Sequence, residues 1–136
     1  RGPLRTAEIT GCNWGATPNW ADFGLLYTPR LNVRRLAYGR FTENAALEAF
    51  ARENSNWLPD FALFMALKTQ KNGKPWYEWE ESLKRREPAA IWQARQELKE
   101  EIRFYTFVQY LFHCQWEQLR TYAHENGISI IGDVPI

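Results

Sequence analysis

The fold predicted from the sequence is organised around residues 109–136, which read QYLFHCQWEQLRTYAHENGISIIGDVPI. Apolar residues recur at steps of three and four through the first part of this stretch, the spacing of one helix face. Gly127 stands where a helix commonly ends in the left-handed conformation. The run 128–131 is apolar apart from Ser129, which is typical of a parallel strand buried on both faces. The stretch therefore predicts a helix, a glycine stop and a buried strand, followed by the carboxylate of Asp133.

The helix of this stretch extends back to Pro88, a residue that suits the first turn of a helix. Unbroken from there to Glu125, it would be about 55 Å long. Its first half keeps a charged face, whereas apolar residues spread around it between Phe104 and Trp116. We therefore expect the first half on a surface and the second half enclosed by other elements.

Shorter helical patterns precede the long helix. Thr28 and Pro29 predict a helix over 29–41 that has proline at its first helical position. Asn44 is a suitable cap for a second helix, and 57–68, apolar on nearly every side, predicts an interior helix. A turn at 72–75 then leads into a short amphipathic helix that ends in the basic residues 84–86.

Composition limits the class of protein. A chain of 136 residues fits one domain, and 17 basic against 16 acidic side chains give a formal charge of +1. This balance offers no electrostatic argument for nucleic acid or for an anionic membrane surface. No run approaches the roughly 18 apolar residues that span a bilayer. Cys12 and Cys114 lack the spacing of metal ligands, so a reduced, cytoplasmic chain is more economical than a secreted disulfide scaffold.

Asp133 is the first candidate for chemistry. It follows the expected strand, and catalytic groups in α/β barrels and open α/β sheets sit at the C-terminal ends of strands. An aspartate at this place also suits a turn, where its side chain binds local backbone amides. Position alone leaves both readings open.

Acidic and aromatic residues alternate over 76–81, which invites comparison with glycosidases. Retaining enzymes of that class need two carboxyl groups about 5 to 5.5 Å apart, one of them with a raised pKa. The spacing also places Glu80 four residues before Lys84, and Glu81 four residues before Arg85. Ion pairs on a solvated helix face are the favoured interpretation.

The two histidines give no active site. His113 lies beside Cys114, but neighbours along a helix point in different directions, so an interior, hydrogen-bonded His113 is favoured. His124 suits a helix C-terminus, where a partly cationic imidazole is favourable. No metal-ligand spacing, phosphate loop or nucleophile elbow is present, so we expect no metal, no cofactor and no complete set of catalytic residues.

From Asp22 to Ile136 the chain resembles the amylomaltase family, the 4-α-glucanotransferases or disproportionating enzymes. The resemblance rests on an ordered set of pieces spread over that range: Asp22-Phe23-Gly24-Leu25-Leu26-Tyr27, Trp57-Leu58, Asp60 to Lys68, Pro75-Trp76 with Trp79, Leu83 to Glu87, Phe107 with Gln109, Phe112 with Gln115-Trp116, and Gly127 to Ile136. Residues 1–21 do not match the family.

The resemblance implies that most of the chain is mainly α, with one buried parallel strand, and belongs to an α/β (TIM) barrel. Residues 1–27 carry scattered Gly and Pro without a sustained period, which predicts an irregular lead-in. The resemblance implies that 28–87 form a helical subdomain inserted into the barrel. Residues 88–136 would hold the return helix and an early barrel strand. The partners implied are α-1,4-glucans, maltooligosaccharides and the remainder of the barrel.

The resemblance also implies a retaining double displacement by an Asp nucleophile, a Glu acid/base and a second, stabilising Asp. All three would lie beyond Ile136, so we expect this chain alone to be inactive. Asp133 and Pro135 fall in the family's first motif and would border the sugar site as supporting residues. The competing hypothesis is a non-catalytic helical interaction or carbohydrate-binding module, motivated by seven Trp without a catalytic constellation.

Overall fold

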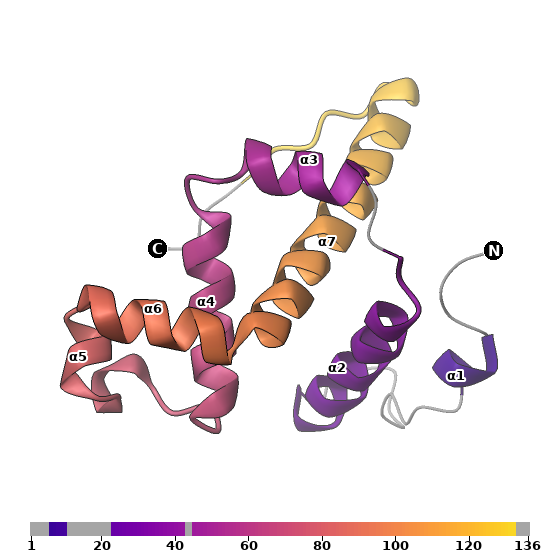
Figure 1. Ribbon diagram of the computed structural model, residues 1–136. Helices are drawn as coiled ribbons and strands as arrows, with labels where there is room; N and C mark the ends of the chain where they lie inside the picture. The colour runs from indigo at the N-terminus through magenta and orange to yellow at the C-terminus, as the bar shows by residue number, and fades with distance from the viewer. Residues whose placement is uncertain (1–5, 11–22, 43–44, 133–136) are drawn as a thin grey trace. The chain divides into compact units, whose positions relative to one another are not determined.

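The computed structural model describes residues 6–10, 23–42 and 45–132. The chain divides into two compact units, 1–48 and 49–136. Every regular element in the described residues is a helix, and Figure 1 shows no strand among them. No helix in the described part is both long and apolar enough to cross a membrane.

The first unit holds α1 (Thr6–Thr10) and α2 (Phe23–Gly39). Glu8 of α1 forms an ion pair with Arg40, just after α2, at 2.6 Å. The helix expected over 29–41 begins six residues earlier, so Pro29 lies inside α2. Proline has no N–H to donate to the preceding turn, and α2 therefore lacks that internal hydrogen bond.

Helix α3 (Ala45–Glu53) crosses the boundary between the units, and the second unit contains the other elements. These are α4 (Leu58–Gln70), the 3-10 turn η1 (Trp76–Glu78), α5 (Glu81–Lys84), α6 (Pro88–Glu97) and α7 (Lys99–Glu125). The capping residue Asn44 of the sequence prediction lies outside the described residues.

The centre of the second unit is the packing of α4 on α7. Ala62 and Ala66 of α4 are completely buried, as are Phe104 and Phe107 of α7. Small side chains allow two helix axes to approach closely, and the bulky rings supply apolar area. A hydrogen bond of 2.6 Å between the hydroxyls of Thr69 and Tyr105 joins the same two helices. The interior helix expected over 57–68 is thus observed as α4.

The long helix expected from Pro88 to Glu125 is interrupted at Leu98. Leu98 has φ −103° and ψ 19°, outside helical values, and Figure 1 shows the chain turning where α6 meets α7. No proline or glycine causes this break. Ala94 and Leu98 are both buried, and α6 packs on both α4 and α7, so tertiary packing decides the turn.

Three helix ends in the second unit share one geometry. Gly127 has φ +72° and donates to the His124 carbonyl at 3.0 Å, while Ile128 donates to the Ala123 carbonyl at 2.9 Å. This is the Schellman arrangement, which satisfies carbonyls that the helix leaves unpaired. The glycine stop predicted from the sequence is confirmed. Helices α4 and α5 end in the same way, with Asn72 and Arg86 in the left-handed position.

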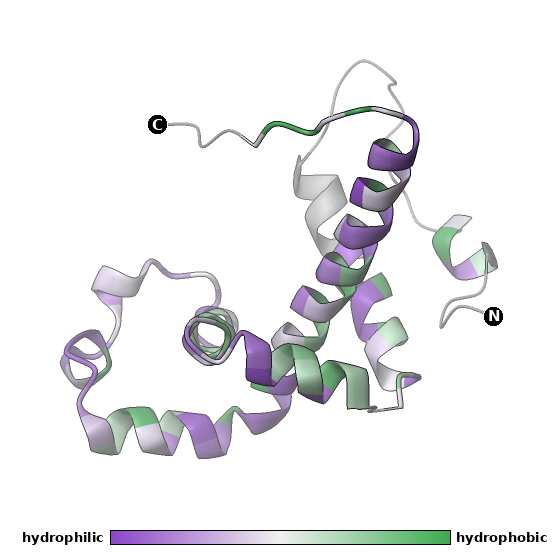
Figure 2. Cartoon of the chain, turned by 90° about the horizontal axis from the view of Figure 1, so that it is seen from above, coloured by the Kyte–Doolittle hydropathy of each residue, from purple (hydrophilic) through white to green (hydrophobic). Residues whose placement is uncertain are grey.

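The expected fold class is wrong for the described residues, because no parallel strand forms after Gly127. Residues 128–132 are coil, drawn in Figure 2 as a thin segment with hydrophobic positions, and Ile131 is 91% exposed. A strand requires backbone hydrogen bonds to a neighbouring strand, and the described chain contains none. The N–H of Ile128 is already donated to the helix cap.

The C-terminal half of α7 also departs from expectation. Phe112, Leu119 and Tyr122 are all more than half exposed, whereas we expected the second half of the long helix to be enclosed. Burial on α7 is concentrated around 104–107, where α4 packs. The apolar spacing was read correctly, but its burial depends on partners that the described residues do not supply.

We predict that Phe104→Ala lowers the free energy of unfolding by about 3–5 kcal/mol, because a fully buried ring leaves a cavity when removed. Phe112→Ala is the matched control: it makes the same change on the same helix at a position that is 61% exposed, and should cost about 0.5 kcal/mol or less. Urea unfolding followed by circular dichroism measures both. Equal losses would contradict the proposed core.

Candidate functional site

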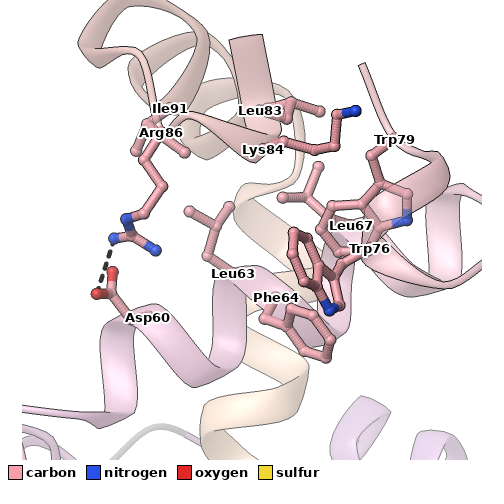
Figure 3. A pocket seen from close by; sticks show the side chains of 10 residues that line it. All are labelled: Asp60, Leu63, Phe64, Leu67, Trp76, Trp79, Leu83, Lys84, Arg86 and Ile91. Atoms are coloured by element: carbon pink, nitrogen blue, oxygen red, sulfur yellow. Dashed lines mark hydrogen bonds and ion pairs between the residues drawn. The ribbon is translucent and has the colours of Figure 1, made fainter. Parts of the chain in front are cut away.

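A cavity of ≈ 310 Å³ lies between α4, η1, α5 and the start of α6 (Figure 3). Leu63 and Leu67 of α4 form its floor and are buried, because the same helix also packs on α7. An aromatic group stands at one end and a charged pair at the other. The lining residues are Asp60, Leu63, Phe64, Leu67, Trp76, Trp79, Leu83, Lys84, Arg86 and Ile91.

The aromatic end is built by Phe64, Trp76 and Trp79. The rings of Phe64 and Trp79 are 5.3 Å apart between centroids and tilted by 36°. Trp79 is buried and donates its indole N–H to the Lys74 carbonyl at 3.1 Å, which satisfies its polar atom and holds the ring in place. Trp76 is 56% exposed, so part of its ring remains open to solvent beside this fixed pair.

The charged end is built around Asp60, in the first turn of α4, where a carboxylate is favoured by the helix dipole. One of its oxygens accepts from Arg86 at 2.8 Å and the other from Arg95 at 3.1 Å. Both arginines and Asp60 remain about half exposed. The three side chains therefore form an ion-paired group of net charge +1 that stays accessible to water.

The backbone of Arg86 is the unusual feature of this end. Arg86 has φ +55°, a left-handed conformation that costs a non-glycine residue about 1–2 kcal/mol. It donates its N–H to the Leu83 carbonyl while Glu87 donates to Ser82, which closes α5. Pro88 then starts α6. The tight end of α5 thereby brings the Arg86 side chain back to Asp60 (Figure 3).

The acidic residues beside the cavity serve as ion-pair partners. Glu81 pairs with Arg85 at 2.8 Å, as its spacing predicted, and also with Lys84 at 2.7 Å. Glu80 pairs with Lys71 instead of the expected Lys84. The hydrogen bond from Lys71 lowers the pKa of Glu80, and hydrogen bonds from Lys84 and Arg85 lower the pKa of Glu81. Neither carboxyl has the raised pKa that a glycosidic general acid needs.

The site residues predicted from the sequence are only partly covered by the structure. Asp133 and Pro135 lie outside the described residues, as does Cys12. His113 is exposed and stacks on Phe50 at 5.0 Å between ring centroids, so its expected interior position is wrong. Cys114 is a free thiol, and its hydrogen bond raises the pKa of the Tyr110 hydroxyl.

His124 is exposed in the last turn of α7. The part of the chain that the structure describes contains no group of three His, Cys, Asp or Glu side chains that could hold a metal ion.

Sequence reasoning missed the cavity although it named some of its residues. Trp76 and Trp79 are among the residues that carry the resemblance, but the structure alone shows that Trp79 is buried and Trp76 exposed at the cavity. Asp60 and Arg86 are 26 positions apart, so no helical spacing relates them. The signal in the sequence was the basic run 84–86 at the end of α5. The chain turns there and directs Arg86 toward Asp60 of α4.

The chain is similar to known proteins both in its sequence and in its backbone. A sequence profile of the family described as 4-alpha-glucanotransferase matches residues 4–136. The chain belongs to this family. The resemblance read from its sequence is thereby confirmed, and it extends over most of residues 1–21, which we had read as not matching.

Named relatives and a solved structure support the same family. The 4-alpha-glucanotransferase of Aquifex aeolicus is 45% identical over 116 residues, covering 85% of this chain and 24% of that protein. The Thermus thermophilus enzyme is 42% identical over 121 residues, covering 85% and 24%. An amylomaltase from Streptococcus agalactiae in complex with acarbose superposes with a TM-score of 0.91 at 34% identity, covering 98% of this chain and 28% of that one. The chain thus spans about a quarter of the length of the relatives it matches.

We predict that Lys71→Met raises the pKa of Glu80 toward the ordinary value of about 4.3 and leaves that of Glu81 in place. The Glu80 carboxyl is more acidic in the folded than in the unfolded chain, so its ion pair stabilises above the unfolded pKa and is lost as pH falls through the folded one. Carboxyl-detected NMR titration measures both groups. If the pKa of Glu80 is the same in Lys71→Met as in the unaltered chain, Lys71 is not its partner in solution.

We predict opposite responses to glycine at the two neighbouring arginines. Arg86→Gly should be more stable than Arg86→Ala by about 1 kcal/mol, because glycine adopts φ +55° without strain. Arg85 has φ −79°, so there Arg85→Gly should be less stable than Arg85→Ala by about 0.5 kcal/mol. The free energies of unfolding of the four variants, measured by chemical denaturation, test this prediction. The same sign at both positions would refute the left-handed conformation of Arg86.

Proposed function

We propose that this chain forms the helical section of a 4-α-glucanotransferase, which transfers α-1,4-glucan chains between maltooligosaccharides. The observation that carries the proposal is the family match over residues 4–136. The agreement of the backbone with an amylomaltase along 98% of the chain supports it. That amylomaltase holds acarbose, an analogue of maltooligosaccharides, which supports an oligosaccharide substrate.

The proposed reaction is a retaining double displacement. A carboxylate attacks the anomeric carbon while a carboxylic acid protonates the leaving oxygen. The hydroxyl of an acceptor sugar then displaces the enzyme carboxylate and gives its proton back to the acid residue, which now acts as base. The acid must keep its proton near neutral pH, which requires a raised pKa. Glu80 and Glu81 do not meet this requirement, because their ion pairs favour the charged form. The working acids are therefore proposed to belong to the part of a family-length protein outside this chain.

Within that protein, the proposed roles follow the family pattern. Residues 28–87 would form the helical insertion and 88–136 the return segment, after the lead-in 1–27. Asp133 and Pro135 would border the sugar site as supporting residues. The remainder of a family-length protein would be the structural partner. A cytoplasmic location, motivated by the sparse and widely spaced cysteines, belongs to the same proposal.

A chimera tests the activity. This chain would replace the matching section of the Aquifex aeolicus enzyme, and the chimera would be incubated with maltotriose. We expect glucose and longer maltodextrins, and no product from the 136-residue chain alone. Asp133→Asn in the chimera should lower kcat/KM while leaving the thermal midpoint unchanged.

The outcomes separate the two hypotheses. A folded chimera without transfer would refute the proposed function and favour the non-catalytic binding module. Product from the isolated chain would show that the catalytic acids lie within it after all. Circular dichroism and the melting temperature, compared with the unaltered Aquifex aeolicus enzyme, establish that the chimera is folded.

A further inference from the structure

We propose that the cavity between α4 and α5 binds a sugar ring of the glucan, stacked on Trp76, with its hydroxyls hydrogen-bonded to the Asp60–Arg86 pair (Figure 3). The sugar class follows from the cavity itself. Its identity as an α-1,4-glucan rests on the proposed function.

The aromatic end supplies a stacking surface. A pyranose ring presents a patch of C–H groups on its face and hydroxyls around its edge, so it pairs with an aromatic plane that has polar groups nearby. Trp76 is 56% exposed at the cavity, and the Phe64–Trp79 pair behind it is held by the indole hydrogen bond to Lys74. A preformed aromatic surface loses little entropy when a ligand settles on it.

The charged end suits a hydroxyl-rich ligand, because its N–H groups already donate to carboxylates. Arg86 and Arg95 are both paired with Asp60, and Lys84 is paired with Glu81 at 2.7 Å. An anion would have to compete with these carboxylates for the same N–H groups. A sugar hydroxyl can instead donate to Asp60 and accept from Arg86 without breaking their pair.

The cavity also has a suitable size. Its volume of ≈ 310 Å³ stands at the lower end of small-ligand sites, about 300–1,000 Å³. It therefore suits a short part of a glucan chain. Trp92 on α6 is more exposed, at 67%, but does not line the cavity, so exposure alone does not make it a binding residue.

Maltohexaose titration of the 136-residue chain tests the proposal. With 15N-labelled indoles, the Trp76 N–H signal should shift and saturate, while the Trp92 signal stays in place. Trp76→Ala should weaken binding about tenfold, the effect expected when an aromatic stacking partner is removed. Trp92→Ala is the matched control and should leave affinity unchanged within twofold. The same titration in the chimera checks that the cavity is open in a family-length protein.

Each outcome supports or overturns the proposal. A saturating shift at Trp76 in both proteins supports it, and needs no variant to fold. Absence of a shift in either protein, equal affinities for the two alanine variants, or displacement of maltohexaose by inorganic phosphate overturns it. The transfer assay is independent of this result: a chimera that transfers but shows no Trp76 shift rejects only the cavity. If the isolated chain binds maltohexaose but the folded chimera is inactive, only the proposed transferase function is rejected.

Discussion

The close packing of α4 on α7 is the interaction on which the second unit depends. Two fully buried alanines on α4 and two fully buried phenylalanines on α7 bring the helices together. Because α4 is apolar on nearly every side, the apolar residues that face away from α7 must be covered by other elements. Leu63 and Leu67 are buried in the floor of the cavity for that reason. The helix packing that forms the core therefore also positions the floor of the cavity.

The turn at Arg86 connects this core to the surface chemistry. By ending α5 in a left-handed residue, the chain returns a guanidinium to Asp60 in the first turn of α4. The cost of that backbone conformation, about 1–2 kcal/mol, is of the same order as what an exposed ion pair returns. Stability alone gives little reason for an arginine here, since glycine would close the helix without strain. A role for the side chain at the cavity gives a reason.

Family membership and local geometry answer different questions about this chain. The ordered motifs and the match over residues 4–136 identify the family, and with it the reaction that we propose. The described residues show ion-paired carboxyls, an exposed indole and an aspartate shared by two arginines, an arrangement that suits the sugar binding that we propose. Glu80 and Glu81 illustrate the point. Their sequence context resembles that of glycosidase acids, yet the cations around them favour the ionised form.

The sequence predicts the helices from α2 to α7 in outline, the stop at Gly127 and the family, because periodicity, helix-end residues and motifs are local or ordered along the chain. It did not determine the break at Leu98, where neither proline nor glycine is present and packing on α4 decides. It also could not determine the state of 128–132, since a strand exists only when a neighbour completes its hydrogen bonds. Asp60 and Arg86 show the same limit at the candidate site. Only the tertiary structure joins residues that no regular spacing relates.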